Sequence, residues 1–421
     1  MVESSISSSV AMFPTDFLFG AATASHQVEG DNQWNDWWDY EQSGRMPFAS
    51  GRSCDHFRRY EEDFELARSW GHNSHRLSVE WSRIEPRDGE WNDDAVAHYA
   101  AVFDALRQRG LEPIVTLNHF TLPSWFLEAG GWSTNDAPAR FALFVDRFVK
   151  EAGNSVTYWL TINEPTVYVQ QAYLSGKWPP LRRWSWITAI KVMRNLARAH
   201  IAAYRCIKQA KGHAKVGLAH AAVDVQPCNP ERMVDRASSR VRDFLLNGLF
   251  FRLIGSSPSS APCDQHNLDF VGINYYTRSC ITAGLIWPPP FFGKVCKLNH
   301  HADSGIQSSL GWEVYPAGLS NVIGRFAQYG LPILITENGI ATDDDRIRCR
   351  YIEDHMRVLA QAISDGLPII GYLHWSMMDN FEWHHGYDAR FGLAEVDDES
   401  LARRARPSAE LYSKICRSRR V

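Results

Sequence analysis

Short apolar segments alternate along this chain with longer amphipathic ones. Several of the short segments are apolar at consecutive positions, as in Ile333-Leu334-Ile335, which is typical of strands covered on both faces. An alternation of such strands with helices predicts βα units built on a parallel sheet. Eight segments are expected to form strands: residues 17–22, 74–80, 113–118, 156–163, 215–219, 268–275, 332–337 and 369–375.

The helices between these strands have recognisable ends. After Asn92, a residue suited to an N-cap, apolar residues follow at Val96, Tyr99 and Phe103, and Gly110 ends the pattern. Spacings of three and four place these apolar side chains on one face of a helix. The same spacing recurs in residues 141–148 and 352–363.

The length of the chain, 421 residues, would suit two or three domains of ordinary size. Eight strands in one alternating series without a low-complexity linker instead favour a single (β/α)₈ TIM barrel over residues 12–421. The Ser-rich residues 1–11 are expected to be flexible. An open, doubly wound sheet is the alternative, but no Gly-rich G-x-G-x-x-G turn follows the first strand.

Composition and charge narrow the classes of function. Lys and Arg total 44 against 48 Asp and Glu, a net charge of -4, so nucleic-acid binding is not expected. The sequence has no apolar run of about 18 residues, so we expect no membrane partner. The first 15 residues carry neither the basic stretch nor the long apolar run of a secretory signal, and the eight cysteines lack the spacing of zinc or dithiol sites. We expect a cytoplasmic protein with free thiols; its oligomeric state is left open.

Two glutamates stand where predicted strands end. Glu164 follows the fourth strand and Glu337 ends the seventh, so in a barrel both would point into the same mouth. Two converging carboxyl groups are what glycosidic bond cleavage requires, one to protonate the leaving oxygen and one to meet the anomeric carbon. A lone glutamate at such a place is usually a surface charge, but here further polar side chains also stand at strand ends: Gln27, Arg76, His119, Asn163, Asn274 and Tyr276.

The sequence around these glutamates resembles a known family. Residues 161–165 (Thr-Ile-Asn-Glu-Pro) and 335–339 (Ile-Thr-Glu-Asn-Gly) are similar to the acid/base and nucleophile motifs of family-1 glycoside hydrolases, the β-glucosidase and β-galactosidase family. The resemblance extends over nearly the whole chain. Its other motifs are residues 19–23, 26–30, 75–84, 272–277, 311–316 and 375–383.

The resemblance implies a retaining, double-displacement mechanism. Glu164 would be the general acid and then base, and Glu337 the nucleophile. It further implies that Arg76, Asn274 and Tyr276 support the nucleophile; that Gln27, His119, Asn163, Trp375, Glu382, Trp383 and Phe391 bind the sugar; and that Trp312 contacts the aglycone. A cis peptide bond between Trp375 and Ser376 is expected on the same ground. No metal or other cofactor is implied, and His384-His385 and residues 343–345 are expected to be solvated loop residues.

Two differences from particular members of this family bear on the substrate. Family members that cleave 6-phospho-β-glycosides carry Ser, Lys and Tyr at the positions of Glu382, Ala389 and Phe391, so a neutral sugar is expected here: glucose, galactose or fucose. Phe120 stands where many relatives have Trp, so one indole N–H is missing from the sugar site.

Two other functions stay open at this stage. One is a catalytically silent sugar-binding protein on the same barrel, since a fold does not fix a function. The other is a transglycosidase, in which an acceptor sugar replaces water. Such an enzyme would use the same two glutamates, so the sequence does not separate it from a hydrolase of small glycosides.

Overall fold

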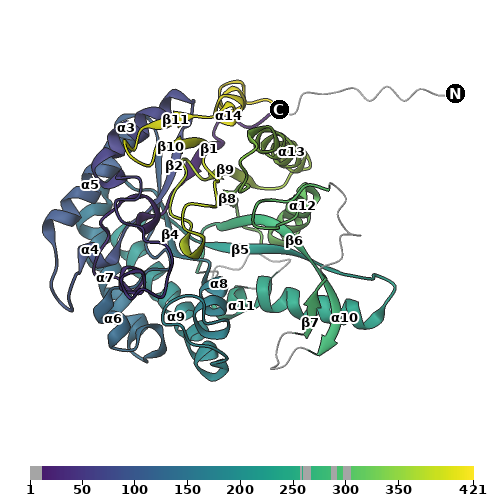
Figure 1. The fold of residues 1–421 in the computed structure, drawn as a ribbon, viewed down its shortest axis with the longest axis horizontal. Helices are drawn as coiled ribbons and strands as arrows, with labels where there is room; N and C mark the ends of the chain where they lie inside the picture. Colours follow the sequence, from purple (N-terminus) through teal and green to yellow (C-terminus); the bar gives the residue numbers. More distant parts are fainter. Residues whose placement is uncertain (1–11, 257, 259–266, 286–291, 297–304) are drawn as a thin grey trace.

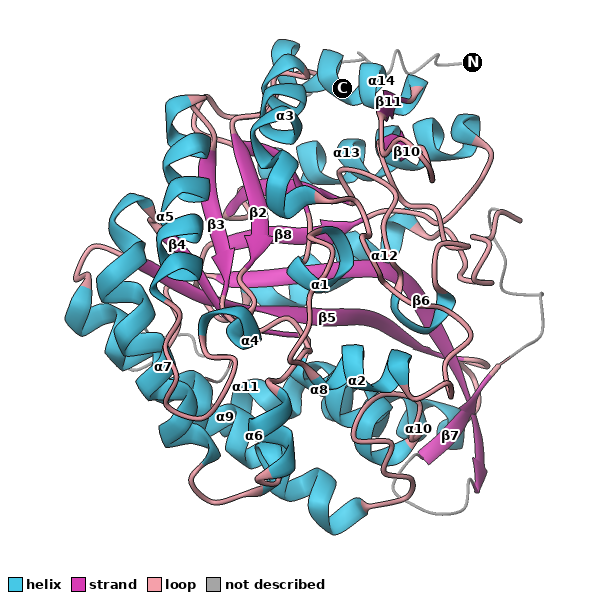
Figure 2. Ribbon diagram, turned by 60° about the vertical axis from the view of Figure 1, so that its left-hand side comes forward, coloured by secondary structure: helices cyan, strands magenta, loops and turns pink. Residues whose placement is uncertain are grey.

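A ring of parallel strands forms the centre of the molecule (Figures 1 and 2). A computed structural model describes residues 12–256, 258, 267–285, 292–296 and 305–421. The strands of the ring are β1 (Leu18–Ala22), β2 (Ser74–Ser78), β3 (Glu112–Thr116), β4 (Tyr158–Asn163), β5 (Lys215–Pro227), β6 (Val271–Leu285), β8 (Ile333–Asn338) and β9 (Ile369–Trp375).

Each of these strands pairs in parallel with two neighbours. β1 pairs with both β2 and β9, with Gly20 opposite Ser74 and Ala22 opposite Trp375. Pairing of β5 with β6, at Ala219 and Gly272, closes the ring. The structure therefore has the (β/α)₈ barrel predicted from the eight apolar segments, and the open sheet is excluded.

Helices surround the ring and cover its outer face (Figure 2). The larger ones are α2 (Asp36–Gln42), α3 (His56–Ser69), α5 (Asp93–Gln108), α7 (Ala137–Ala152), α9 (Trp186–Ala210), α10 (Met233–Asp243), α12 (Pro316–Ala327), α13 (Asp345–Ser364) and α14 (Pro407–Ser418). The shorter α helices are α1 (Ser25–Val28), α4 (Trp81–Ile84), α6 (Ser124–Glu128), α8 (Pro165–Val169) and α11 (Leu249–Leu253).

The helix predicted after Asn92 shows how these elements begin and pack. The Asn92 side chain accepts a hydrogen bond from the Ala95 backbone N–H, as an N-cap does, and α5 ends just before Gly110. Its predicted apolar face, including Tyr99 and Phe103, is buried. Side chains inside the ring form a separate apolar cluster of smaller extent, with Ile114 and Leu373 among its members.

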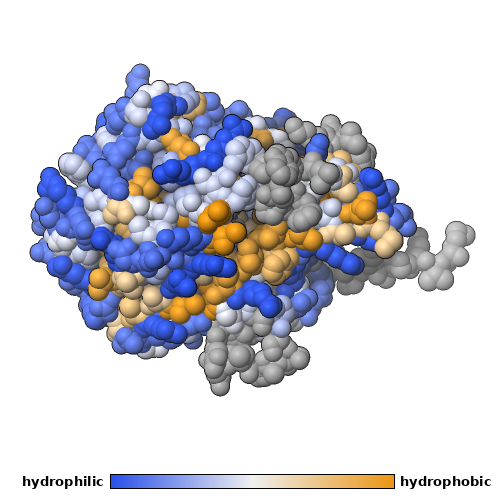
Figure 3. All heavy atoms as spheres, turned by 90° about the horizontal axis from the view of Figure 1, so that it is seen from below, coloured by the Kyte–Doolittle hydropathy of each residue, from blue (hydrophilic) through white to orange (hydrophobic). Residues whose placement is uncertain are grey.

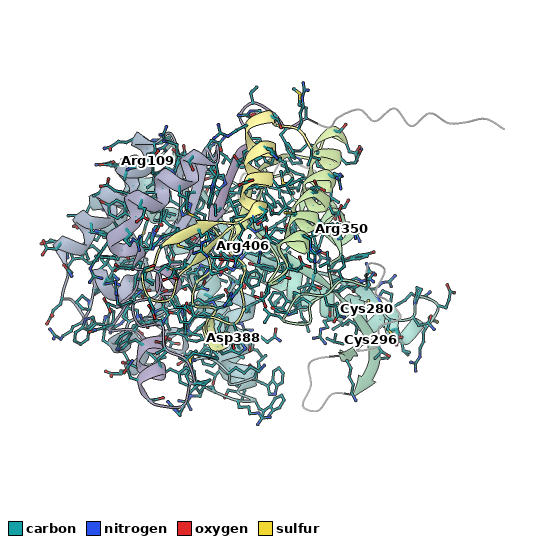
Figure 4. The ribbon with its side chains drawn as sticks, turned by 45° about the horizontal axis from the view of Figure 1, so that its top comes forward. Arg109, Cys280, Cys296, Arg350, Asp388 and Arg406 are labelled. Carbon is teal, nitrogen blue, oxygen red and sulfur yellow. The ribbon has the colours of Figure 1, made fainter. Side chains whose placement is uncertain are left out.

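Two barrel strands are longer than the sequence predicted. Beyond the ring, β5 and β6 continue as a paired ribbon, with Asp224 opposite Arg278 and Pro227 opposite Ile281. The antiparallel strand β7 (Phe292–Val295) adds to β6, so that Cys280 and Cys296 lie side by side (Figure 4). The prediction ended these strands early because the ribbon alternates apolar with polar side chains and is only half-buried.

Other predictions have different outcomes. The expected flexible residues 1–11 lie outside the described residues, as does Cys263. Of the seven described cysteines, Cys54, Cys280 and Cys416 are buried and the others are partly exposed. No helix among the described residues is long and apolar enough to cross a bilayer. A small two-stranded sheet of β10 (Ala394–Val396) and β11 (Arg403–Ala405) completes the C-terminal part.

Candidate active site

A pocket of about 280 Å³ opens at the carboxyl ends of the barrel strands, where active sites of this fold lie. Glu164 follows β4 directly and Glu337 belongs to β8, so strands on different sides of the ring bring both carboxyl groups to one cavity. The predicted site residues that line it are Gln27, His119, Asn163, Glu164, Asn274, Tyr276, Trp312, Glu337, Trp375, Glu382, Trp383 and Phe391. Arg76 lies directly beneath, fully buried within the ring.

Glu337 is held by a cation and a phenol. Arg76 donates to its Oε1 at 2.5 Å, and the Tyr276 hydroxyl donates to its Oε2 at 2.6 Å. Burial, followed by the charges of Glu337 and Glu164, raises the pKa of Tyr276 well above its ordinary value, so this phenol stays a donor. Both carboxyl oxygens of Glu337 thus have a fixed donor, Arg76 on one side and Tyr276 on the other.

Two asparagines connect the glutamates. The Asn163 side-chain oxygen accepts from Arg76 at 2.7 Å and from the Asn274 amide at 3.2 Å. The same Asn274 amide donates to Glu164 Oε1 at 2.7 Å, while its oxygen accepts from the Thr336 hydroxyl at 2.6 Å. Every one of these bonds has a defined donor, so the network fixes the orientation of both amides.

Glu164 has a different environment from Glu337. Burial first, and the negative charge of Glu337 second, raise the pKa of Glu164 to about 8, against a smaller lowering by Asn274 and Arg76. At neutral pH this carboxyl group therefore carries a proton. Its backbone is also unusual, because Glu164 has a φ of 43° at the turn from β4 into α8. Positive φ values in residues other than glycine concentrate at functional sites, and pocket residues Phe120 and Trp383 share the feature.

A third carboxyl group stands at the far side of the pocket. The Gln27 amide nitrogen lies 3.2 Å from Glu382 Oε2 and 2.9 Å from the Phe381 carbonyl. Burial, then the charge of Glu337, raises the pKa of Glu382 to about 8, while hydrogen bonds from Trp375 and Gln27 lower it. The Gln27 side-chain oxygen has no partner among the described residues, which leaves a buried acceptor beside the cavity.

His119 offers a matching donor. Because the Asn163 oxygen is engaged by Arg76, its amide nitrogen donates to His119 Nε2 at 3.2 Å, which places the ring proton on Nδ1. Burial and Arg76 lower the pKa of His119 well below its ordinary value, so the ring is neutral. Nδ1 has no partner among the described residues. Gln27 and His119 thus present an unused acceptor and an unused donor, the groups that bind a sugar hydroxyl.

Aromatic rings form the walls. The His119 ring is nearly parallel to the rings of Trp375 and Trp383, with interplanar angles of 15° and 13°. On the opposite side, Tyr276 contacts Trp312 at 5.5 Å and Phe391 at 6.0 Å between ring centroids. A polar floor between flat apolar rings suits a sugar, whose C–H faces pack on aromatic rings while its hydroxyls bond at the rim.

Backbone features place the Trp375 wall against the carboxyl groups. The peptide bond between Trp375 and Ser376 is cis, as predicted. A side chain at Gly339 would meet the Trp375 carbonyl oxygen at 1.8 Å, so only glycine permits this approach of β9 to the residue that follows Asn338. Beyond β9, Arg406, which Figure 4 labels near its centre, bonds to Asp379 at 2.7 Å and ties the loop that carries Glu382 to the C-terminal part.

Sequence reasoning missed part of the pocket wall. His384 and His385 were expected to be solvated, but both are half-buried on the wall, and His384 accepts a hydrogen bond from Trp178. Their positions follow from the short turn Trp383–His385, which no spacing in the sequence indicates. Of the expected solvated residues 343–345, Asp344 caps α13. Further wall residues without a sequence signal are Val167, Gln171, Ala221, Ala222, Val223 and Leu310.

A second cavity, of about 600 Å³, adjoins the pocket. The two share Val167, Val223, Thr277 and Trp312, so Trp312 stands between them. The β5–β6 ribbon supplies much of the outer wall. A larger cavity of about 790 Å³ lies elsewhere, between residues 49–54 and 387–404, and does not contain the two glutamates. Among the described residues, no group of three His, Cys, Asp or Glu side chains is arranged to hold a metal ion.

Known proteins match this chain along its whole length. The family model for glycosyl hydrolase family 1 matches residues 9–258 and 259–421. A β-galactosidase of Pyrococcus woesei is 31% identical over 92% of this chain and 93% of its own, and a 6-phospho-β-galactosidase of Lacticaseibacillus casei is 30% identical over 96% and 97%. The solved structure of a β-glycosidase from Pyrococcus horikoshii superposes with a TM-score of 0.90 at 39% identity, covering 98% of this chain and 96% of that one.

The fold and the pair of glutamates in its mouth define a retaining O-glycosyl hydrolase of the β-glucosidase type. The chain belongs to glycosyl hydrolase family 1.

Proposed function

We propose that this enzyme hydrolyses the terminal, non-reducing β-D-glucosyl residue of small glycosides and oligosaccharides, with galactosyl and fucosyl residues as further candidates. Glu164 is the acid/base and Glu337 the nucleophile. One observation carries this assignment: Glu337 is held by Arg76 and Tyr276, whereas burial raises the pKa of neighbouring Glu164 to about 8. Carboxyl groups whose surroundings separate their proton affinities divide into an acid and a nucleophile.

In the first step, the Glu337 carboxylate attacks the anomeric carbon while Glu164 gives its proton to the leaving oxygen. The C–O bond to the aglycone breaks and a glycosyl ester of Glu337 forms. Forming the ester removes the negative charge that raised the pKa of Glu164, so Glu164 then exists as a carboxylate. It takes a proton from water, which attacks the anomeric carbon; the bond from that carbon to Glu337 breaks, and the sugar leaves with retained configuration.

The sugar is held by groups that surround the nucleophile. Gln27 and Glu382 offer hydrogen-bond acceptors and donors to the sugar hydroxyls on one side of the pocket. His119 and Asn163 do the same on the other side. Trp375 and Trp383 form the aromatic wall, and Phe391 closes the side near Tyr276. These contacts support a neutral glycone, because a 6-phosphate would meet the Glu382 carboxyl group and find the apolar Ala389 where a cation is needed.

The aglycone side is built differently. Trp312 is partly exposed between the pocket and the adjoining 600 Å³ cavity, where it can stack on a leaving group. An acceptor sugar bound beyond Trp312 would replace water in the second step, so transglycosylation at high sugar concentration is part of the proposal. The silent sugar-binding alternative has less support, because neither carboxyl group nor its partners are missing.

A panel of aryl β-glycosides tests the proposal, with glucose, galactose, fucose, mannose and xylose as glycones and kcat/KM as the measure. We expect the glucoside, galactoside or fucoside to lead, and the β-anomer of the sugar to be the first product by NMR. Preference for mannose or xylose would overturn the glycone assignment. Measurable glucose binding without hydrolysis of any glycoside would favour the silent protein.

A further inference from the structure

One sector of this acidic protein is exclusively basic. Between Glu164 and Asp224 the sequence contains no Asp or Glu. The Lys and Arg residues of this interval are Lys177, Arg182, Arg183, Lys191, Arg194, Arg198, Arg205, Lys208, Lys211 and Lys215. Because the whole chain has a net charge of -4, this interval concentrates positive charge on α9 and the segment before it.

The outer face of α9 is where this charge reaches solvent. Lys191, Arg194 and Arg198 follow one another at spacings of three and four, so they lie on one side of the helix, and all three are exposed. Arg182 and Arg183, just before the helix, are exposed as well. We call these five residues together with Trp184, Ile187 and Ile190 the α9 face.

On two other surface helices, exposed basic residues are neutralised by neighbouring carboxylates. On α7, Arg147 pairs with Glu151 and Lys150 with Asp146, each one helical turn apart. On α13, Arg350 and Arg357 both pair with Asp354. Within the part of the chain that the structure describes, none of the five basic side chains of the α9 face has such a carboxylate partner. Their charge is therefore available to an external anion.

Apolar side chains project from the same face. Ile187 is 87% exposed, Ile190 56% and Trp184 46%, so three apolar side chains that are close in sequence project into solvent beside the basic ones. Trp184 also has a φ of 57°, and its backbone is held there by a hydrogen bond to Leu174. A bulky residue in this region is a backbone outlier, and its consequence here is an outward-facing indole. The Arg183 guanidinium lies 5.2 Å from that ring.

The α9 face lies at the end of the barrel where the pocket opens. Trp178, which lines the pocket, is separated from Arg182 by a single short turn. Burial first, and then neighbouring charges that include Lys177, lower the pKa of the pocket residues His384 and His385. Figure 3 views the molecule from the side on which α9 lies in Figure 1 and shows hydrophobic atoms exposed among hydrophilic ones. Whatever binds this face therefore approaches the rim of the active site.

We propose that the α9 face docks on the surface of an anionic lipid bilayer. Lysine and arginine attract acidic headgroups, and tryptophan and isoleucine at the tip of the same face enter the boundary between headgroups and acyl chains. This contact is peripheral and needs no membrane-spanning helix. The exposed isoleucines favour a bilayer over a nucleic acid, whose phosphates would be bound by the basic residues alone.

The test is sedimentation of the full chain with vesicles. We expect binding to vesicles of 30% phosphatidylserine in phosphatidylcholine, weakening as salt rises, and much weaker binding to phosphatidylcholine alone. Lys191→Gln with Arg194→Gln should lower the partition coefficient by roughly thirtyfold. Ile187→Ser with Ile190→Ser should lower it by roughly tenfold, because the inserted apolar area is lost.

Matched substitutions separate this face from general effects. Arg350→Gln with Arg357→Gln removes two exposed basic residues of α13, and Leu143→Ser removes an exposed apolar residue of α7; both should leave vesicle binding unchanged. All variants should hydrolyse a soluble aryl glycoside at the unaltered rate, which confirms folding. Failure to bind anionic vesicles, or equal loss in the α13 variant, overturns the proposal. Binding of duplex DNA that the isoleucine variant leaves intact would assign the face to a nucleic acid instead.

Discussion

The Asn274 amide nitrogen lies 2.7 Å from Glu164 Oε1, and through Asn163 it joins the acid/base to Arg76, the cation that holds the nucleophile. The two glutamates therefore share one hydrogen-bond network but not one charge partner. Of the two glutamates, only Glu337 bonds directly to Arg76. At Glu164, burial raises the pKa more than the attraction of the same arginine lowers it.

The raised pKa of Glu164 predicts the alkaline limit of activity. Below about pH 8 this carboxyl group is protonated and can act as the acid; as pH rises through about 8 the proton is lost. We expect kcat/KM for a 4-nitrophenyl glucoside to fall above that pH and Glu164→Gln to have no such limb. The pH profiles of both proteins check this.

The effect of Glu382 on the pH profile has to be distinguished from that of Glu164, because the pKa of Glu382 is also raised to about 8. A 2,4-dinitrophenyl glucoside leaves without protonation, so a limb due to Glu164 should disappear with this substrate. If the alkaline limb persists with this substrate in the wild-type enzyme and is changed by Glu382→Gln, it comes from the sugar-binding carboxyl group instead.

Replacement of the nucleophile should stop the reaction. Glu337→Gln keeps a hydrogen-bonding side chain beside Arg76 but cannot form the ester, so we expect kcat to fall by about 10⁴-fold or more. Glu337→Gly with added azide should give the α-glycosyl azide, because azide then attacks from the face that the carboxylate occupied. Formation of the β-azide, or unchanged turnover, would remove Glu337 from this role.

Tyr276 and its neighbour Tyr275 form a matched pair for testing support of the nucleophile. Tyr276→Phe removes the bond to Glu337, and we expect kcat to fall by roughly 10²-fold. Tyr275 donates instead to the Tyr315 carbonyl, so Tyr275→Phe should cost about 1 kcal/mol of stability and leave kcat intact. Equal losses of kcat in the two variants would contradict the assigned role.

The glycone prediction concerns the lack of a cation beside Glu382. A 6-phosphoglucoside should be cleaved at least a hundredfold less efficiently than the plain glucoside, because no cation stands at Ala389. Glu382→Ser with Ala389→Lys should narrow that ratio. A wild-type enzyme that prefers the phosphorylated substrate would show that the phosphate is bound by groups outside this wall.

The barrel was predictable because strands covered on both faces leave a continuous apolar signal, as in residues 333–335. The two glutamates were predictable because position at a strand end is a sequence property. The β5–β6 ribbon was not, since its half-buried residues alternate and resemble a surface loop. Nor were His384 and His385, because a turn directs them inward.

The positions of aromatic residues near the pocket entrance could not be predicted from the sequence either. The sequence places Tyr168, Tyr173 and Trp178 after the fourth strand without indicating which of them faces the pocket. Only Trp178 lines the pocket, whereas the two tyrosines are buried and contact each other at 6.1 Å between ring centroids. Spacing on a short helix does not determine in which direction each side chain points. The π-type turn at residues 170–174 interrupts the helix and changes these directions further.

The overhang of β5 and β6 gives this enzyme two regions that can diverge independently. Within the ring, the same strands contribute Asn274 and the backbone next to Glu164, where a change of one atom affects the chemistry. Past the rim, they form the wall of the adjoining cavity, on the far side of Trp312 from the pocket. Lengthening, shortening or replacing this overhang is thus a route by which evolution or an engineer can exchange leaving-group preference while the bond-breaking apparatus stays as it is.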